Sequence, residues 1–293
     1  MSTIETWIDF STDLPRPGSL DVVWAHGSES AKHNADPDIQ IHAYNEHTFI
    51  LRQNMAVNYE APFLFLLFGS ERALLIDTGA TASTDFFPLR AIVDDLMDRW
   101  LLAHRRDRYG LVVLHTHAHG DHIAGDSQFA DRPDTLVVPA DRGGAWRFFG
   151  FDHDPYLVAS VDLSGRVVEC LATPGHHPAG VTFYDPYTGL LLTGDTVYRG
   201  RLYISDWPSF IATIDRLIEF SSGRSVTHIL GCHIEMTCRP GVDYPVRTTY
   251  QPDEPPLQMS TDQLRDIRAA INEVGAATGR YAFDDFILCI GED

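Results

Sequence analysis

Short hydrophobic runs separated by turn residues dominate the chain and predict β-strands. The clearest run is Phe63–Phe68, which ends at Gly69-Ser70 and is too short to span a bilayer. Similar runs predict strands at 48–52, 73–77, 111–115, 135–139, 166–172, 181–185, 190–193 and 225–231. The segment 185–189, Asp-Pro-Tyr-Thr-Gly, is typical of a hairpin turn.

Apolar residues spaced three and four apart predict helices over 83–102, 208–220 and 261–274. The second of these has Asp206 as a candidate cap and Pro208 in its first turn. Groups of strands with helices inserted at intervals favour an α/β fold, in which sheets pack together and helices cover their outer faces.

No repeat, low-complexity tract or long polar linker divides the chain, so we expect a single domain over residues 1–293. Residues 1–60 are expected to supply N-terminal strands and loops. Residues 251–293 are expected to form a C-terminal helix and strand packed on the body, after a loop at 251–256.

The net charge of the chain limits the kinds of binding partner to be expected. Lys and Arg number 22 against 41 Asp and Glu, which gives a formal charge of −19. A chain this acidic repels phosphate backbones and anionic lipid headgroups, so nucleic acid and membrane are not expected as partners. We expect a small-molecule substrate, and the sequence leaves the oligomeric state open, with a homodimer as one option.

The first seven residues, Met1 to Trp7, have neither the basic nor the apolar region of a secretory signal, so a cytoplasmic protein is expected. The four cysteines have no disulfide-framework spacing and are expected to be reduced. Cys170 and Cys289 lie in apolar runs and are expected in the core. Cys232 adjoins a histidine but should point the other way in a strand, into the core.

The sharpest motif is His-Thr-His-Ala-His-Gly-Asp-His at 115–122, directly after an apolar run. It contains the pattern H-x-H-x-D-H. With 14 histidines in 293 residues, chance produces that pattern roughly 0.004 times in such a chain. Coincidence is therefore a poor explanation.

The motif suits metal binding. In an extended backbone residues i and i+2 point to the same side, so His117 and His119 can hold one ion. A turn at Gly120 lets Asp121 and His122 face a second position nearby. Imidazole and carboxylate are ligands for zinc, iron or manganese.

Three later segments each place one more candidate ligand after an apolar strand: His176, Asp195 and His233. A glycine stands one or two positions before each of them and lets the backbone approach a crowded site. Alone each segment is weak evidence, but their order after H-x-H-x-D-H adds to the motif.

This whole set resembles the metallo-β-lactamase-fold superfamily over roughly residues 63–233. The resemblance implies a four-layer αββα sandwich that holds one or two metals at the strand ends. The segment 74–79, Leu-Leu-Ile-Asp-Thr-Gly, is similar to the family's aspartate turn, which supports the metal loop without binding the ions.

The resemblance also implies a role for each candidate ligand. His117, His119 and His176 would bind the first metal. Asp121, His122 and His233 would bind the second, and Asp195 would bridge both.

A cysteine stands in place of Asp195 in true lactamases that use a thiolate, whereas a bridging aspartate is similar to glyoxalase II and lactonases. Antibiotic hydrolysis is therefore disfavoured. Tyr198 has a spacing that resembles lactonases in which a tyrosine contacts the substrate carbonyl, and its phenol is a candidate to stabilise an oxyanion. The tail after His233 lacks the larger helical domain with which glyoxalase II binds glutathione, which weakens a glutathione thioester as substrate.

The resulting hypothesis is a hydrolase with a dinuclear centre, zinc by first choice and iron or manganese as options. A bridging hydroxide would attack an ester, thioester or lactone carbonyl. Asp121 would accept and redeliver the proton as a catalytic residue, beside Tyr198.

Three alternatives stay open. A mononuclear iron dioxygenase similar to persulfide dioxygenases would use His117, His176 and Asp195. A phosphodiester nuclease is disfavoured by the charge of −19. A binding protein that kept the fold but lost catalysis would typically have lost ligands, and all seven are present here.

Overall fold

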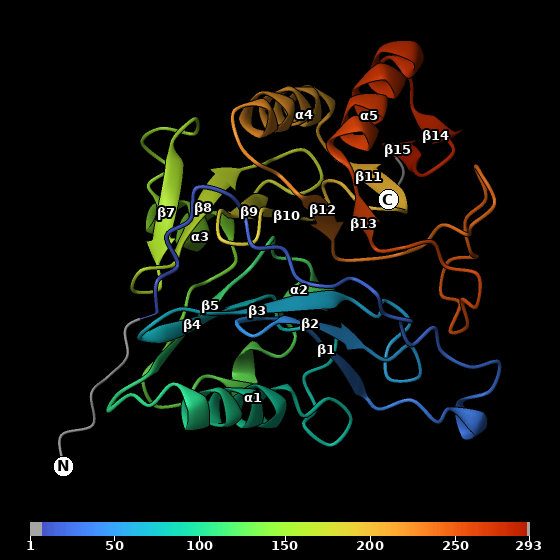
Figure 1. Ribbon diagram of the computed structural model, residues 1–293. Coiled ribbons are helices and arrows are strands. Elements are labelled where there is room, and N and C mark those ends of the chain that lie inside the picture. Colours follow the sequence, from blue (N-terminus) through green and yellow to red (C-terminus); the bar gives the residue numbers. More distant parts are fainter. Residues whose placement is uncertain (1–7, 292–293) are drawn as a thin grey trace.

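Two six-stranded sheets face each other in the computed structural model, which describes residues 8–291 (Figure 1). In spatial order the first sheet is β1 (Ile39–Asn45), β2 (Thr48–Gln53), β3 (Phe63–Phe68), β4 (Arg72–Ile76), β5 (Gly110–Leu114) and β6 (Thr135–Val137). The second is β13 (Gln258–Met259), β12 (His228–Gly231), β10 (Leu190–Gly194), β9 (Val181–Asp185), β8 (Val167–Ala172) and β7 (Val158–Asp162). A three-stranded sheet, β11 (Arg201–Ile204), β15 (Ile287–Ile290) and β14 (Gly279–Ala282), adjoins them.

The alternation of side chains along β3 builds two hydrophobic cores at once. Phe63 and Phe65 pack in the cluster between the two sheets, whereas Leu64 and Leu66 pack with α1 (Leu89–Ala103). The outer face of the second sheet packs against α4 (Trp207–Ser222) and α5 (Thr261–Val274). The layers therefore run helix, sheet, sheet, helix (Figure 1), and the αββα sandwich is confirmed.

The predicted helices are present, with one wrong boundary. α5 begins and ends where its periodicity indicates, and the Asp206 carboxylate caps α4 by accepting the N–H of Ser209 at 3.3 Å. The predicted helix at 83–102 begins only at Leu89. Pro88 is the reason, because a proline disfavours helical backbone at the residue before it.

The predicted strands are all present within a few residues, and 185–189 is the turn of the β9–β10 hairpin. The periodicity missed several elements, most of them short. These are β1, β7, β11, β13, β14, α2 (Gly120–Ile123), α3 (Arg142–Phe149) and the two 3₁₀ turns Ala31–His33 and Asp126–Gln128. Apart from β1, which has seven residues, the missed strands are short and depend on pairing with distant strands more than on their own pattern.

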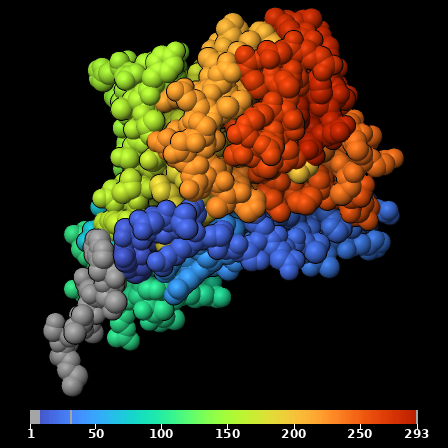
Figure 2. All heavy atoms as spheres, turned by 45° about the horizontal axis from the view of Figure 1, so that its top comes forward, coloured from blue at the N-terminus to red at the C-terminus, as the bar shows by residue number. Residues whose placement is uncertain are grey.

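Both ends of the described chain are tied to the body. β15 pairs in parallel with β11, and the buried Arg52 and Glu254 side chains form an ion pair at 2.6 Å between β2 and the 251–256 loop. Gly27 and Tyr250 form a β-bridge, and Figure 2 shows the blue N-terminal residues against the orange C-terminal half. These contacts support a single domain, which stays a prediction.

All four cysteines are free, and Cys170 and Cys289 lie in the core as predicted. Within residues 8–291 we find no helix with the length and apolar character needed to cross a bilayer. Met1 to Trp7, the segment on which the expected absence of a secretory signal rests, lies outside the described residues.

A pH test follows from His47, which is buried and accepts the indole N–H of Trp100 at its Nδ1, 3.1 Å away. Burial, helped by His104 and Arg166, lowers the pKa of His47 from 6.5 to about 4, against Glu46. The stability that neutral His47 contributes is complete above pH 6.5 and is lost as the pH falls toward 4.

We therefore expect the free energy of unfolding to fall more steeply in the wild type than in His47→Gln over that range, by up to about 1.4 kcal/mol per pH unit. Urea denaturation at stepped pH measures both slopes. His153→Gln, at an exposed position, is the matched control. Equal slopes in the wild type and His47→Gln would contradict the assignment.

Candidate metal centre

The carboxyl ends of strands from both sheets meet at one edge of the sandwich, and the seven candidate ligands lie there. β5 leads into the histidine motif, and His122 lies in the short helix α2. His176, Asp195 and His233 follow β8, β10 and β12 within a few residues. Strands that run in the same direction end at the same edge, so residues far apart in sequence converge.

Glycines make this convergence possible at two of the strand ends. Gly175 has φ of +139°, and a Cβ there would lie 2.6 Å from the Cα of Phe210 in α4. Gly194 has φ of +54°, and a Cβ would lie 2.6 Å from the Cβ of Thr116. Only glycine fits such positions without displacing backbone or buried neighbours.

The first group of ligands is a triangle of imidazole nitrogens. His117 Nε2 lies 3.0 Å from His119 Nδ1 and 3.3 Å from His176 Nε2, and the third side, His119 Nδ1 to His176 Nε2, is 3.1 Å. Nitrogens bound tetrahedrally to zinc are about 3.3–3.4 Å apart, given zinc–nitrogen bonds of about 2.0–2.1 Å. The triangle therefore fits one cation.

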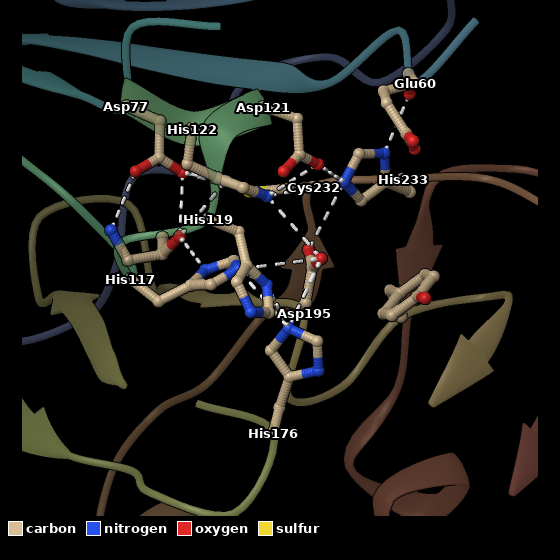
Figure 3. Close-up of polar contacts among 12 residues, drawn as sticks. Glu60, Asp77, His117, His119, Asp121, His122, His176, Asp195, Cys232 and His233 are labelled. Carbon is tan, nitrogen blue, oxygen red and sulfur yellow. Dashed lines mark hydrogen bonds and ion pairs between the residues drawn. The ribbon is translucent and has the colours of Figure 1, made fainter. Parts of the chain in front are cut away.

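The second group is equally compact. Asp121 Oδ2 lies 3.2 Å from His122 Nε2 and 3.3 Å from His233 Nε2, and these two nitrogens are 3.5 Å apart. Figure 3 shows these side chains pointing toward one another from α2 and from the segment after β12. The mixed carboxylate and imidazole set fits a second cation of the zinc, iron or manganese type.

Asp195 lies between the two groups. Its Oδ2 is 3.5 Å from His122 Nε2, 3.8 Å from His176 Nε2 and 3.9 Å from His117 Nε2, and its Oδ1 is 3.4 Å from His233 Nε2. Its Oδ1 is buried without a hydrogen-bond partner. A buried carboxylate oxygen in that state is costly unless a cation or a donor faces it, and the donor set here fits a cation shared by both groups.

Hydrogen bonds from Nδ1 fix the orientation of three histidines. His122 Nδ1–H donates to Asp77 Oδ2 at 2.9 Å. His233 and His176 donate from Nδ1 to the carbonyl oxygens of Glu60 and Tyr203, both at 2.8 Å. In each ring this leaves the Nε2 lone pair facing the cluster, which is the tautomer that a metal ligand needs.

Asp77 anchors the motif loop. It is fully buried, has a left-handed backbone (φ +66°), and accepts the N–H of Thr116 at 2.7 Å and its hydroxyl at 2.8 Å, besides His122. A non-glycine residue in this conformation is strained and persists only where its surroundings hold it. Asp77 therefore supports the loop without belonging to either ligand group.

The pKa values of the histidines shift in opposite directions in the two ligand groups. Burial lowers the pKa of His117 and of His119. Burial opposes the charged form of His122 as well, but Asp195, Asp77 and Asp121 outweigh it and raise its pKa well above 6.5. A cation at the second group would take the place of such protons.

A cavity of about 570 Å³ opens onto the cluster, and five ligands line it: His119, Asp121, His176, Asp195 and His233. Tyr203 and Ile204 of the third sheet form part of its wall, together with Ser205, which directly follows β11. A hollow of about 760 Å³ near the start of β4 and β5 has no histidine or cysteine in its lining, so the chemistry belongs to the smaller cavity.

Tyr198 lines this cavity, but its hydroxyl is engaged by the protein. The phenol is buried, donates to the carbonyl of Arg201, and lies 3.1 Å from Glu235 Oε2. That arrangement favours a positioning role over contact with a substrate carbonyl. Asp121, by contrast, has a side chain 21% exposed, open to the cavity.

The sequence did not predict the side-chain contacts at two carboxylates near the site, Asp77 and Asp126. Cys232 is buried as predicted, but its Sγ lies 3.4 Å from Asp77 Oδ2, so the thiol touches the anchor as well as the core. His115 Nε2 donates to Asp126 at 2.8 Å, and Thr78 donates to the same oxygen at 2.7 Å. Neither pairing carries a spacing signal, since the partners lie on different strands and turns.

A third histidine group, Glu46, His47 and His104, lies away from this edge. His47 Nδ1 accepts the Trp100 N–H, so the hydrogen of the neutral ring is on Nε2. That ring offers no lone pair toward Glu46 and His104, and the group is not a candidate centre.

The family model described as "Metallo-beta-lactamase superfamily" matches residues 61–269. Among curated proteins, the hydroxyacylglutathione hydrolase of Rhizobium meliloti (strain 1021) is 30% identical over 145 residues, 48% of this chain and 53% of the relative. The acyl-coenzyme A thioesterase MBLAC2 of Homo sapiens is 26% identical over 209 residues, 58% of this chain and 72% of the relative. The alignments span 53% to 64% of the first three curated relatives' own lengths.

Solved structures agree on the fold. A metallo-beta-lactamase from Pontibacter korlensis superposes with a TM-score of 0.52 at 13% identity, covering 80% of this chain and 99% of that one. The TMB-1 structure gives the same TM-score of 0.52 at 12% identity, with coverage of 81% and 99%.

Asp77→Asn tests the anchor. An amide in that position cannot accept all three hydrogen bonds as a carboxylate does, so His122 loses its fixed tautomer. We expect zinc affinity, measured by competition with a chromogenic chelator, to fall about 10- to 100-fold. Asp85→Asn, at an exposed position, should retain wild-type affinity, and an unchanged affinity in Asp77→Asn would refute the anchoring role.

Proposed function

The chain belongs to the metallo-beta-lactamase superfamily, and on that premise we propose that it is a metal-dependent hydrolase of small-molecule thioesters, with esters and lactones as related substrates. The main support for this proposal is the pair of compact candidate ligand groups, with Asp195 close to both. We propose that they hold two metal ions, zinc by first choice, with iron or manganese as options.

The relatives favour thioesters within this range of substrates. A hydroxyacylglutathione hydrolase and an acyl-coenzyme A thioesterase are both named for hydrolysis at a thioester. After His233 the described chain forms β13, α5 and the β14–β15 hairpin, and the third sheet lines the cavity. Substrate selection in this chain would therefore involve that sheet.

We propose that His117, His119 and His176 hold one cation, that Asp121, His122 and His233 hold the other, and that Asp195 contacts both. When bound, such ions supply Lewis acidity, which polarises a carbonyl and lowers the pKa of water. Asp121 faces the cavity and is the candidate to accept a proton from water and return it to the leaving group. The bonds from Asp77, Glu60 and Tyr203 keep the imidazoles in place.

An iron dioxygenase is the second candidate, because His117, His176 and Asp195 form a two-histidine, one-carboxylate set. It would leave the second group without a function. The compactness of that group, and its own link to Asp77, favour the dinuclear hydrolase.

Metal content separates the two candidates. Elemental analysis of protein purified without a metal-binding tag should give close to two zinc or manganese ions per chain, reduced in His117→Ala and in Asp195→Ala. Thioester hydrolysis should fall at least about 100-fold in both variants, since each removes a direct ligand. His153→Ala, an exposed histidine, is the control.

One iron per chain would instead support the dioxygenase. A chain with no metal above the level of the variants would end both proposals.

Tyr198→Phe tests the role of the phenol. Because the hydroxyl bonds Arg201 and Glu235, its removal should cost about 1–3 kcal/mol of unfolding free energy and change kcat by less than about 3-fold. Tyr184→Phe is the control, a buried tyrosine that donates to Ser225 away from the cavity. A loss of kcat near 100-fold with unchanged stability would instead support the oxyanion role that the resemblance implies.

A further inference from the structure

A second, smaller cavity adjoins the metal centre. It has a volume of about 240 Å³ and shares Glu60, Tyr203 and Glu235 with the cavity that opens onto the ligands. Its other lining residues include Tyr59, Arg201, Arg247 and Gln251. We refer to it as the side cavity, and its shared lining places it directly beside the cavity that opens onto the candidate ligands.

Glu60 marks the junction. Its carbonyl accepts the Nδ1–H of His233 at 2.8 Å (Figure 3). The residue also lines both cavities. A residue that lines the side cavity, Glu60, is therefore in direct contact with a candidate metal ligand, His233. A group held there would belong to the same substrate whose reacting bond lies over the ligands.

Most charges around the side cavity cancel. Arg201 pairs with Glu235 and, at 2.9 Å, with Asp243, and Asp243 also pairs with Arg280. These four residues sum to zero, and Glu60 adds one more carboxylate to the lining. Arg201 nonetheless keeps a buried Nε–H without an acceptor, in a side chain that is only 8% exposed.

Arg247 is the remaining cation of the lining. It is exposed, and within residues 8–291 it makes no ion pair with a carboxylate inside 4 Å. Its backbone is in the left-handed region (φ +67°), which a non-glycine residue adopts at a cost. Tyr59 lines the same cavity as Arg247. A hydrogen bond to Glu60 and burial raise the pKa of the Tyr59 phenol, and Arg247 opposes that rise.

We propose that the side cavity binds a carboxylate of the substrate through the Arg247 guanidinium, with the Tyr59 hydroxyl beside it. A guanidinium presents paired N–H donors that match the two oxygens of a carboxylate. The preferred substrate is then an acyl thioester with a carboxylate on a short aliphatic stem. This inference rests on the proposed thioesterase function.

The test compares two substrates that differ only in charge: the N-acetylcysteamine thioester of glutarate with its far carboxylate free, and the same thioester with that carboxylate converted to an amide. Metal-loaded wild type should prefer the acid in kcat/KM by about 10- to 100-fold. In Arg247→Ala the ratio should fall close to one, and Arg247→Lys should recover part of it.

Arg239→Ala is the matched control, because it removes an exposed arginine from the same C-terminal segment without touching the side cavity. It should keep the wild-type ratio. A ratio that Arg247→Ala leaves unchanged, or a wild type that prefers the amide, would overturn the proposal.

Binding separates failure of this proposal from failure of the hydrolase. If the metal-loaded wild type cleaves neither thioester, the hydrolase proposal fails for this substrate class, and calorimetry with glutarate and glutaramide still tests the site. The Kd for glutarate should then rise at least about 10-fold in Arg247→Ala and stay unchanged in Arg239→Ala. Equal affinities in all three proteins would refute a carboxylate site.

Discussion

The buried carboxylate of Asp77 is the interaction on which the candidate centre depends. It directly follows β4, takes a left-handed backbone, and accepts three hydrogen bonds from Thr116 and His122. Those bonds hold the motif loop against the end of the neighbouring strand and set the tautomer of one ligand. A buried carboxylate is costly unless its oxygens are satisfied, so the fold of the loop and the satisfaction of Asp77 stabilise each other.

The four-layer sandwich explains how side chains more than one hundred residues apart share a site. Three cores, one between the sheets and one under each outer helix layer, fix the directions of the strands. Once β5, β8, β10 and β12 are fixed, the residues that follow them must meet at the common edge. Each of these strand ends then contributes one or a few candidate ligands to the site.

The third sheet contributes to the wall of the cavity that opens onto the candidate ligands. The ligands come from the sandwich, whereas the cavity wall includes β11, and the Arg201 network joins that strand to the 235–244 segment. The two sides meet at Glu60 and Tyr203, whose carbonyls orient two ligand histidines. Under the proposed function, changes in this wall would alter substrate selection without altering the candidate ligand set.

The sequence by itself determined an α/β class with packed sheets and outer helices, most of the strands and the H-x-H-x-D-H motif, because strand alternation, helical periodicity and residue spacing are local properties. The four-layer αββα order and the roles of the later candidate ligands followed from the family resemblance. Only the tertiary structure decided which contacts each ligand makes. Cys232 against Asp77, Tyr198 against Glu235 and His233 against Glu60 join segments with no fixed spacing. Short elements such as β11 and β14, and the side cavity beside them, likewise arise from pairing between distant strands, which one-dimensional patterns do not encode.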